Sequence, residues 1–248
     1  MGVTTKKTAK KKAESKAEPI RVPPLWRHAL VWARRGVFGV AAFYFTLMMI
    51  FSFAPPPGNL YQWSESLRLG GIDRQWVDWD NIAPVMARSV VAGEDANFCL
   101  HWGFDMQSIR DAIEKGSRRG ASTLSQQTVK NVFLWQGHSW VRKAMEALMT
   151  PVTELMWTKR RILELYLNEA EFGEGVFGVQ AGAQAMFNVD AKDLTASQAA
   201  RLAAVLPNPK EWHAGKPGPY VRKRADQIAS GAETIEVDGR AKCFEAVH

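Results

Sequence analysis

Apolar residues recur three or four positions apart along much of this chain, the spacing that places them on one face of an α-helix. The pattern predicts helices over five segments: residues 81–93, 105–115, 139–157, 160–169 and 195–206. Thr195 is a candidate N-cap for the last segment, and Pro207 follows its final turn. The sequence has no alternating strand pattern of comparable strength and no internal repeat. We therefore expect the chain beyond residue 75 to be mainly α-helical.

One stretch lacks a polar face altogether. Residues 36–54 (GVFGVAAFYFTLMMIFSFA) carry no charged side chain, and they lie between two arginines and three consecutive prolines. A helix of this length measures about 28 Å, close to the hydrocarbon thickness of a bilayer. A buried core helix is one alternative, and a signal peptide cleaved after Ser52-x-Ala54 is another, but the run is long and apolar for either. The sequence predicts one transmembrane helix over residues 36–54.

The net charge of +7 is distributed unevenly. Residues 1–35 hold ten Lys and Arg against two Glu, a local net of +8, so the rest of the chain is close to neutral. This distribution therefore argues against a basic nucleic-acid-binding globule. By the positive-inside rule, residues 1–35 are a basic cytoplasmic tail and the chain after residue 54 lies across the membrane. Residues 55–75, rich in Pro, Gly and polar groups, are expected to form a connector with one or two short strands at most.

The chain has two cysteines, Cys99 and Cys243, and neither belongs to a CxxC or Cys/His metal spacing. No zinc site is predicted. An oxidising compartment would allow a disulfide between them. Because spacing along the chain does not reveal proximity, two free thiols is the interpretation that the sequence favours.

A carboxylate stands at the end of the first predicted helix. In residues 90–105 (VVAGEDANFCLHWGFD) the apolar run meets Glu94, and Phe98 and His101 follow. A carboxyl group at the end of an apolar helix, walled by aromatic rings, is partly desolvated, which raises its pKa and suits it to proton transfer. An ordinary solvated helix end is the simpler interpretation of this stretch taken alone.

A second polar stretch is residues 120–131 (GASTLSQQTVKN), which crowds Ser122, Gln127 and Lys130 together. Backbone N–H groups at a helix start, with a lysine as counter-charge, form a cradle for an anion. The GxxxxGK[ST] spacing of a P-loop is absent. The same residues are equally consistent with an ordinary N-capped polar helix.

Two more clusters contain charged residues at helical spacing. In RKAME, residues 142–146, Arg142 and Glu146 stand one turn apart, and residues 159–179 (KRRILELYLNEAEFGEGVFGV) include Asn168 before a glycine-rich segment. A pair such as Arg142 and Glu146 is usually a surface ion pair that contributes a few tenths of a kcal/mol. No single cluster proves an enzyme.

The order of the clusters is more informative than any one of them. EDANFCLHWGFD, GASTLSQQTVKN, RKAME, the segment 159–179 and LAAVLPNP at 202–209 closely resemble, in sequence and spacing, the five motifs of the peptidoglycan glycosyltransferases. The resemblance covers roughly residues 60–212. Transpeptidase signatures of the SxxK, SDN and KTG type are absent, so the resemblance is to the monofunctional form of the family.

The resemblance implies a mainly α fold, a lysozyme-like transglycosylase domain with a small membrane-proximal lobe, preceded by one transmembrane helix. We expect the glycosyltransferase domain over residues 76–230 and a C-terminal tail over 231–248. The implied location is the bacterial inner membrane, as a single-pass protein with a periplasmic catalytic domain. Implied partners are lipid II, the growing glycan strand and proteins of the divisome or elongation machinery, with no nucleic acid.

The family transfers a glycan chain onto lipid II with inversion and releases undecaprenyl pyrophosphate. By resemblance, Glu94 is the general base, and Glu146 is a second essential carboxylate that either holds a divalent metal or orients cations. The resemblance assigns substrate binding to a further set: Ser122, Gln127, Lys130, His138, Arg142 and Asn168. Asn168 is expected to shape the cleft. Mg²⁺ or another divalent cation is a candidate cofactor, and no metal ligands are assigned.

His138 departs from the family pattern, which commonly has an arginine at this position. An imidazole has a reference pKa of about 6.5, so its charge depends on pH, unlike that of a guanidinium. We therefore expect weaker donor binding at alkaline pH. The loop 133–140 (FLWQGHSW) is also rich in aromatic residues, a pattern consistent either with insertion into the outer leaflet or with core packing.

Two other function classes remain open from the sequence. Lysozyme-like folds also include glycan-cleaving enzymes such as lytic transglycosylases, but these have no pyrophosphate leaving group for Lys130 to stabilise. A non-catalytic wall-binding scaffold is the second alternative, and the presence of both Glu94 and Glu146 argues against it.

Overall fold

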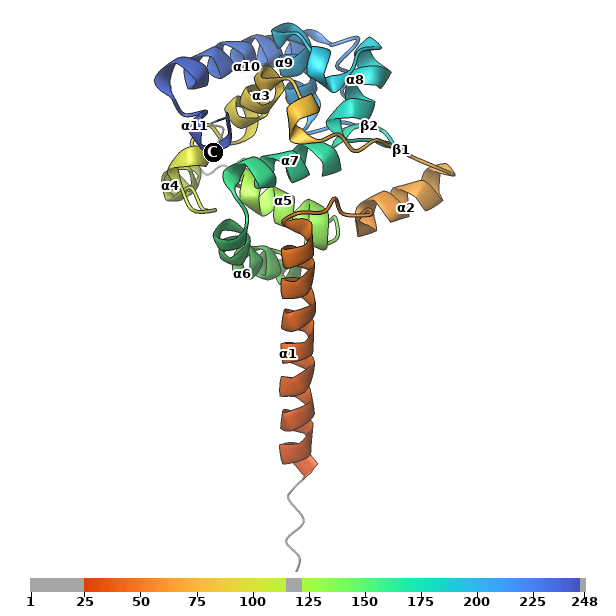
Figure 1. The fold of residues 1–248 in the computed structure, drawn as a ribbon, viewed down its shortest axis with the longest axis vertical. Coiled ribbons are helices and arrows are strands. Elements are labelled where there is room, and N and C mark those ends of the chain that lie inside the picture. Colours follow the sequence, from red (N-terminus) through yellow and green to blue (C-terminus); the bar gives the residue numbers. More distant parts are fainter. Residues whose placement is uncertain (1–24, 115–121, 246–248) are drawn as a thin grey trace, which may run out of the picture. The chain divides into compact units, whose positions relative to one another are not determined.

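The structure is a computed structural model that describes residues 25–114 and 122–245. Residues 1–24 of the expected basic tail, residues 115–121 and residues 246–248 lie outside this description. The elements are α1 (Leu25–Phe51), α2 (Leu60–Leu69), β1 (Asp73–Arg74), η1 (Trp79–Asn81), α3 (Pro84–Glu94), η2 (Phe98–Leu100), α4 (Met106–Glu114), α5 (Leu124–Phe133), α6 (Trp140–Met156), α7 (Lys159–Glu169), β2 (Glu171–Gly173), β3 (Val176–Phe177), α8 (Val179–Phe187), η3 (Ala191–Asp193), α9 (Ala196–Val205), α10 (Pro219–Asp238) and α11 (Lys242–Glu245) (Figure 1).

The predicted mainly α fold is confirmed, and the five predicted helices correspond to α3, α4, α6, α7 and α9. Local hydrogen bonds explain where several of them begin. Ser139 accepts a hydrogen bond from the backbone N–H of Arg142 at the start of α6, and Thr158 caps α7 in the same way. Thr195 forms a full capping box with Gln198 at the start of α9. The caps satisfy N–H groups that the first turn of a helix leaves unpaired.

The apolar helix α1 begins before the predicted transmembrane span of residues 36–54, and it ends before that span does. Trp26–Phe51 is long and apolar enough to cross a membrane, and little of it is buried, whereas a core helix is mostly buried. The helix begins before residue 36 because the residues there, including Arg34 and Arg35, are compatible with helix formation. It ends at Phe51, shortly before the three prolines, which cannot continue a helix.

The chain divides into two compact units, residues 1–43 and Tyr44–His248. The last turns of α1 therefore belong to the larger unit. Met48 and Phe51 are buried in its core, where the ring of Phe51 stacks on Phe133. The Trp157 indole N–H donates a hydrogen bond to the Met48 carbonyl, at 2.8 Å. Residues 44–51 are thus part of the folded domain.

The expectation of one or two short strands at most over residues 55–75 is wrong, because the helix α2 occupies the centre of that segment. Asn59 and Gln62 form a capping box at the helix start, and Gly70 ends it in the left-handed conformation, at φ 77°. The buried carboxylate of Glu169 accepts hydrogen bonds from the side chains of Asn59 and Gln62, at 2.7 and 2.9 Å. Polar composition suggested a loop, but the polar groups are helix caps and buried partners.

The glycine-rich segment after α7 forms two strands of a small sheet. Its strand order is β1-β3-β2, with β1 parallel to β3 and β2 antiparallel to β3. The register pairs Asp73 with Val176, and a bulge lies between Glu171 and Gly173. The sheet joins the segment after α2 to the segment after α7, so it links the first part of the domain to its centre.

Residues 231–245, the described part of the expected C-terminal tail, include the end of α10 and the helix α11. The helix α10 continues to Asp238, and Ile235 on it is 1% exposed. The short helix α11 follows and buries Phe244 completely. The apolar pattern of α10 is weak in the sequence because the small residues Ala225 and Ala232 alternate with larger apolar residues on its buried face.

The helices of the larger unit pack in two groups. In one, α10 lies along α9 and α3, and in the other α5 lies against α7 and α6 (Figure 1). Fully buried side chains such as Leu124, Ile162 and Leu202 fill the core, and each contributes about 1.5–3 kcal/mol on burial. This packing fixes the end of α3 relative to α5 and α10, where the candidate site lies.

Candidate active site

Glu94 is the last residue of α3, and the helix is held firmly by its buried face. Val90 and Val91, in the turn before Glu94, are 0% exposed. Pro84 starts the helix, and the backbone N–H of Asp95 closes it on the Val91 carbonyl. The Glu94 side chain itself is 13% exposed. The carboxylate therefore projects from a rigid helix end into a cleft that remains open to solvent.

The carboxylate of Glu94 is contacted from two directions. The Gln127 side-chain amide donates a hydrogen bond to Oε2 at 3.2 Å, and Arg224 Nη2 lies 3.4 Å from Oε1. The Tyr166 hydroxyl donates to the Gln127 oxygen at 3.3 Å, which turns the amide nitrogen toward Glu94. Burial raises the pKa of Glu94 above its ordinary value, and its hydrogen bond from Gln127 and the nearby cations oppose this rise.

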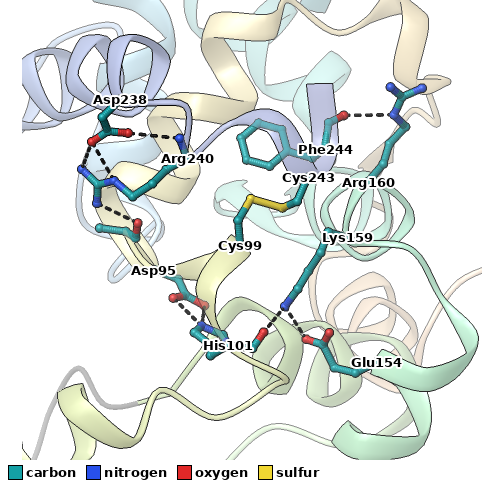
Figure 2. The surroundings of a disulfide bond; sticks show 11 residues. Asp95, Cys99, His101, Glu154, Lys159, Arg160, Asp238, Arg240, Cys243 and Phe244 are labelled. Atoms are coloured by element: carbon teal, nitrogen blue, oxygen red, sulfur yellow. Dashed lines mark hydrogen bonds and ion pairs between the residues drawn. A yellow bond between two sulfur atoms is a disulfide. The ribbon is translucent and has the colours of Figure 1, made fainter. Parts of the chain in front are cut away.

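The loop after Glu94 is held by a network of polar contacts around Asp95 (Figure 2). His101 Nε2 lies 2.9 Å from Asp95 Oδ1, and the backbone N–H of Leu124 donates to Oδ2 at 2.9 Å. Lys159 donates to the His101 carbonyl at 2.8 Å. Asp95 therefore joins the end of α3 to the start of α5, and it fixes the distance between the two helices that carry the site.

Cys99 and Cys243 form a disulfide bond, so the expectation of two free thiols is wrong (Figure 2). The Cα atoms lie 5.6 Å apart although 144 positions separate the two residues. The bond joins η2, in the loop after Glu94, to α11. The sequence did not reveal this pairing because it depends on α10 returning the chain to the first motif.

A group of cations lies beside Glu94 on α5 and α6. It comprises Lys130, Arg142 and Lys143. Burial lowers the pKa of Lys130 and of Lys143, and the positive charge of Arg142 lowers both further. Lys143 donates hydrogen bonds to Ser122 Oγ at 3.0 Å and to Glu146 Oε2 at 2.9 Å. Cations that are desolvated and repel one another form a site that favours an anion.

Glu146 is buried among these cations. Its side chain is 3% exposed, and it forms ion pairs with Arg142 and Lys143 on its own helix. Because both carboxylate oxygens face cations, Glu146 is placed to orient these two side chains. It lies on a different helix from Glu94, so the two carboxylates differ in their surroundings. One faces the open cleft and the other holds the cation group.

Glu94 and its hydrogen-bond partner Gln127 line two different surface hollows. Glu94 lines the first with Asp95, Asn97 and Ser122. The second is lined by Gln127 and Lys130 with Tyr61, Tyr166, Glu171 and Pro207, and so contains residues of α2, α5 and α7. A carboxylate with a raised pKa thus lines one hollow, and its partner Gln127 lines another that includes Lys130 of the cation group.

Comparison with known proteins agrees with this geometry. The family model described as Transglycosylase matches residues 64–233, more than half of the chain. The chain belongs to the transglycosylase family. It is 57% identical over 236 residues to the biosynthetic peptidoglycan transglycosylase of Jannaschia sp. (strain CCS1), covering 95% of this chain and 99% of that protein.

More distant relatives carry the same description. The biosynthetic peptidoglycan transglycosylases of Caulobacter vibrioides and Yersinia pestis are 44% and 48% identical over 200 and 209 residues, respectively. Each comparison covers 79% of this chain and 87% of the relative. The family that the five motifs predicted is therefore confirmed. The transglycosylase domain expected from the sequence is confirmed with it.

The structure brings most of the predicted site residues of this transglycosylase together. Contacts link Glu94 to Gln127, and Ser122 through Lys143 to Glu146. Lys130 interacts electrostatically with both Glu94 and Arg142, and Arg142 pairs with Glu146. His138 is exposed on the loop before α6, and the adjacent Gly137 carbonyl accepts a hydrogen bond from Arg142 at 2.9 Å. The individual roles of these residues in binding and catalysis stay predictions.

Asn168 differs from the other predicted residues, because its amide is used inside the protein. It is 1% exposed, accepts a hydrogen bond from the Val77 N–H at 2.8 Å, and donates to the carbonyls of Val77 and Glu164. These bonds clamp the segment before α3 onto α7. Asn168 therefore supports the cleft and presents no polar group to a ligand.

The residues around Glu146 do not fit a divalent cation held by the protein. Within residues 25–114 and 122–245, no group of three or more His, Cys, Asp or Glu is placed to hold a metal. Glu146 is already paired with Arg142 and Lys143, and two cations beside a carboxylate disfavour a third. We derive no step through a metal ion.

Sequence reasoning missed two residues that contact the site, Arg224 and Tyr166. Arg224 belongs to a basic run, residues 222–224, which lies beyond the five motifs. The run does contain a signal: Val221, Ala225 and Ile228 mark the buried face of α10, and helical spacing places Arg224 on that same face. Tyr166 lies on the buried face of α7 and gave no signal beyond its apolar neighbours.

Proposed function

We propose that this transglycosylase polymerises peptidoglycan by transferring a growing glycan chain onto lipid II. The observation that carries the proposal is the partly desolvated carboxylate of Glu94, which stands at the mouth of a cleft beside three partly buried cations. A base for an acceptor hydroxyl and a site for a pyrophosphate are the two requirements of an inverting transfer from a polyprenyl pyrophosphate donor. The names of the relatives support the same substrate class.

In the proposed reaction, the 4-hydroxyl of the acceptor sugar gives its proton to Glu94. The hydroxyl oxygen attacks the anomeric carbon of the donor, and the bond between that carbon and the pyrophosphate oxygen breaks. Undecaprenyl pyrophosphate leaves with the electron pair, and the anomeric carbon is inverted. Lys130, Arg142 and Lys143 stabilise the negative charge that grows on the leaving group.

The cation group is arranged before the substrate arrives. Glu146 balances one of the three positive charges, which leaves an excess that an anion would neutralise. Binding of a pyrophosphate would restore the pKa of Lys130 and of Lys143 toward ordinary values, so the group gains stability when the donor binds. In this proposal, Glu146 orients the cations and takes no part in proton transfer.

A membrane location fits the substrate, whose lipid carrier remains in the bilayer. The single apolar helix α1 is compatible with a single-pass anchor. We propose that it spans the bacterial inner membrane with the basic tail in the cytoplasm and the catalytic domain in the periplasm, as the excess of Lys and Arg before residue 36 supports. The disulfide supports an oxidising compartment for the catalytic domain.

The product of the reaction tests this proposal. Detergent-solubilised full-length protein is incubated with fluorescent lipid II, with and without Mg²⁺, and in parallel with preformed glycan strands. We expect a polymer from lipid II that muramidase digests and no shortening of the strands. Shortened strands without polymer would assign the chain to the glycan-cleaving class. Binding without either change would favour a scaffold.

A further inference from the structure

The helix α10 lies outside the five motifs, yet it approaches the end of α3 closely. A Cβ atom added at Gly93 would lie 3.0 Å from Ile228 Cδ1, and one added at Gly231 would lie 3.1 Å from the Ala92 side chain. Both distances are tighter than ordinary contacts between side chains, so the absence of a side chain at each position permits this approach. The close packing brings the buried face of α10 next to Glu94.

Arg224 extends from this face to the last turn of α3. Its Nη2 donates to the Gly93 carbonyl at 3.2 Å and lies 3.4 Å from Glu94 Oε1. The carbonyls in the last turn of a helix have no partner within the helix, and a cation there is favoured by the helix dipole. One nitrogen thus contacts both the backbone that carries Glu94 and the carboxylate itself.

The two oxygens of Glu94 have different partners. Gln127 on α5 donates to Oε2, and Arg224 on α10 contacts Oε1. The other groups that face the carboxylate are Lys130 on α5, the Tyr166 hydroxyl on α7 and the neighbouring Asp95. Among the described residues, Arg224 is therefore the hydrogen-bond partner of the Glu94 carboxylate that carries a positive charge.

We propose that Arg224 is a positioning residue that holds the Glu94 carboxylate in its catalytic orientation and keeps it ionised. The inference rests on the proposed role of Glu94 as the acceptor of the proton. A positive charge beside a carboxylate favours its ionised form and so opposes the effect of burial. Without Arg224, Glu94 would retain its proton to a higher pH. Its carboxylate would be held by the hydrogen bond from Gln127 alone and would be freer to rotate.

The matched variants are Arg224→Gln, Arg224→Lys and Lys223→Gln, all in the full-length protein. Arg224→Gln removes the charge, and Arg224→Lys restores it. Lys223, the preceding residue on α10, is exposed, so Lys223→Gln makes the same change in net charge away from the site. The dependence of kcat/KM on pH is measured with lipid II, and thermal unfolding shows whether each variant is folded.

We expect the acid limb of the Arg224→Gln profile to move up by about one pH unit, the size typical of a nearby opposite charge. Below that limb, kcat/KM falls about tenfold relative to the wild type. Arg224→Lys should return the limb most of the way, and Lys223→Gln should match the wild type. An unchanged limb in folded Arg224→Gln would overturn the proposal, even if activity fell equally at every pH.

A second measurement does not depend on turnover. The protein is labelled with ¹³C at glutamate carboxyl groups, and the Glu94 signal is assigned by its loss in Glu94→Gln. We expect NMR titration to show a higher pKa for Glu94 in Arg224→Gln than in the wild type. An equal pKa would overturn the role of Arg224, whereas a wild type that makes no polymer would overturn only the proposed function.

Discussion

At the scale of single residues, the site depends on a carboxylate that is costly to bury. The raised pKa of Glu94 comes chiefly from its burial in the cleft, which disfavours the charged form that a general base needs. Gln127 and Arg224 offset part of this cost through their contacts with the two oxygens. The same desolvation that prepares Glu94 for proton transfer therefore reduces the stability of the folded protein at neutral pH.

This cost can be measured by replacing the charge. Because the pKa of Glu94 is higher in the folded than in the unfolded chain, its contribution to stability falls as the pH rises through the interval between the two values. Glu94→Gln removes this loss, so its melting temperature should exceed that of the wild type by a few degrees at pH 8 and by less at pH 5. Glu233→Gln, an exposed position on α10, serves as the control. A constant difference between pH 5 and pH 8 would contradict the account.

His138 gives a second prediction at this scale. It is exposed on the loop before α6, next to the Gly137 carbonyl that accepts a hydrogen bond from Arg142. An arginine at this position would add a permanent positive charge beside the cation group. We expect His138→Arg to lower the KM for the lipid II donor by about fivefold, the effect of about 1 kcal/mol from one exposed ion contact. Steady-state kinetics check this, and an unchanged KM would remove the role of position 138.

The sequence identified the site residues whose signal is local. Glu94 ends an apolar helix, and Lys130 lies in a polar stretch beside a helix start, so both were found from neighbouring residues. Arg224 and the partners of Asn168 depend on contacts between segments about 90 to 130 positions apart in the chain. Hydrophobic spacing describes one helix at a time, and it does not show which helix ends meet.

At the scale of elements, the disulfide is the strongest link between distant segments. It ties η2 to α11, close to the network in which Asp95 holds His101 and Leu124 (Figure 2). A cross-link restricts the unfolded chain more than the folded one, and the effect grows with the length of the loop that it closes. The bond therefore supports the loop after Glu94 without touching the carboxylate.

Reduction of this bond should lower stability. We expect dithiothreitol to reduce the free energy of unfolding by about 3–5 kcal/mol, given the 144 positions between the cysteines. Urea unfolding with and without the reductant measures the change. A variant with both Cys99→Ser and Cys243→Ser should match the reduced wild type and should not respond to the reductant. A wild type that is unaffected by full reduction would contradict this prediction.

The elements that the sequence predicted well are those with large apolar residues on one face, such as α3 and α6. The elements that it missed, or whose extent it did not predict, are stabilised differently. The helix α2 is short and polar, and it depends on the Asn59–Gln62 capping box and on the buried Glu169. The helix α10 buries mainly alanines and isoleucines, which gives a weak hydrophobic pattern. Caps and small buried residues carry less signal than apolar spacing.

At the scale of the whole molecule, an exposed apolar stripe runs along α6. Val141, Leu148 and Leu155 are spaced seven residues apart, so they share one face, and they are 65–75% exposed. Trp140, at the start of the helix, is 92% exposed, whereas Phe133 and Leu134 in the preceding loop are buried. The aromatic loop predicted from the sequence therefore divides into a core part and an exposed part. We propose that the stripe contacts the lipid surface.

This proposal predicts membrane binding by the larger unit alone. The test uses a chain that starts at Tyr44, because Met48 and Phe51 belong to the core of the larger unit. A truncation after residue 54 would remove both side chains and expose that core. We expect the chain from Tyr44 to sediment with liposomes. Leu148→Ser together with Leu155→Ser should weaken its partitioning by at least about tenfold, given about 1.5–3 kcal/mol for each buried leucine.

The control is Val237→Ser, which changes an equally exposed apolar residue on α10. It should leave the partitioning of the same chain unchanged. Equal binding by the double variant and the control would show that the stripe does not face the membrane.

The central claim is that Glu94 takes the proton from the acceptor while the cation group receives the pyrophosphate. The most direct test compares initial rates of lipid II polymerisation by the wild type, Glu94→Gln and the control Glu233→Gln. We predict a loss of about 10²–10⁴-fold for Glu94→Gln, the usual contribution of a general base, and a normal rate for Glu233→Gln. A folded Glu94→Gln variant that polymerises lipid II at the rate of the wild type would contradict the claim.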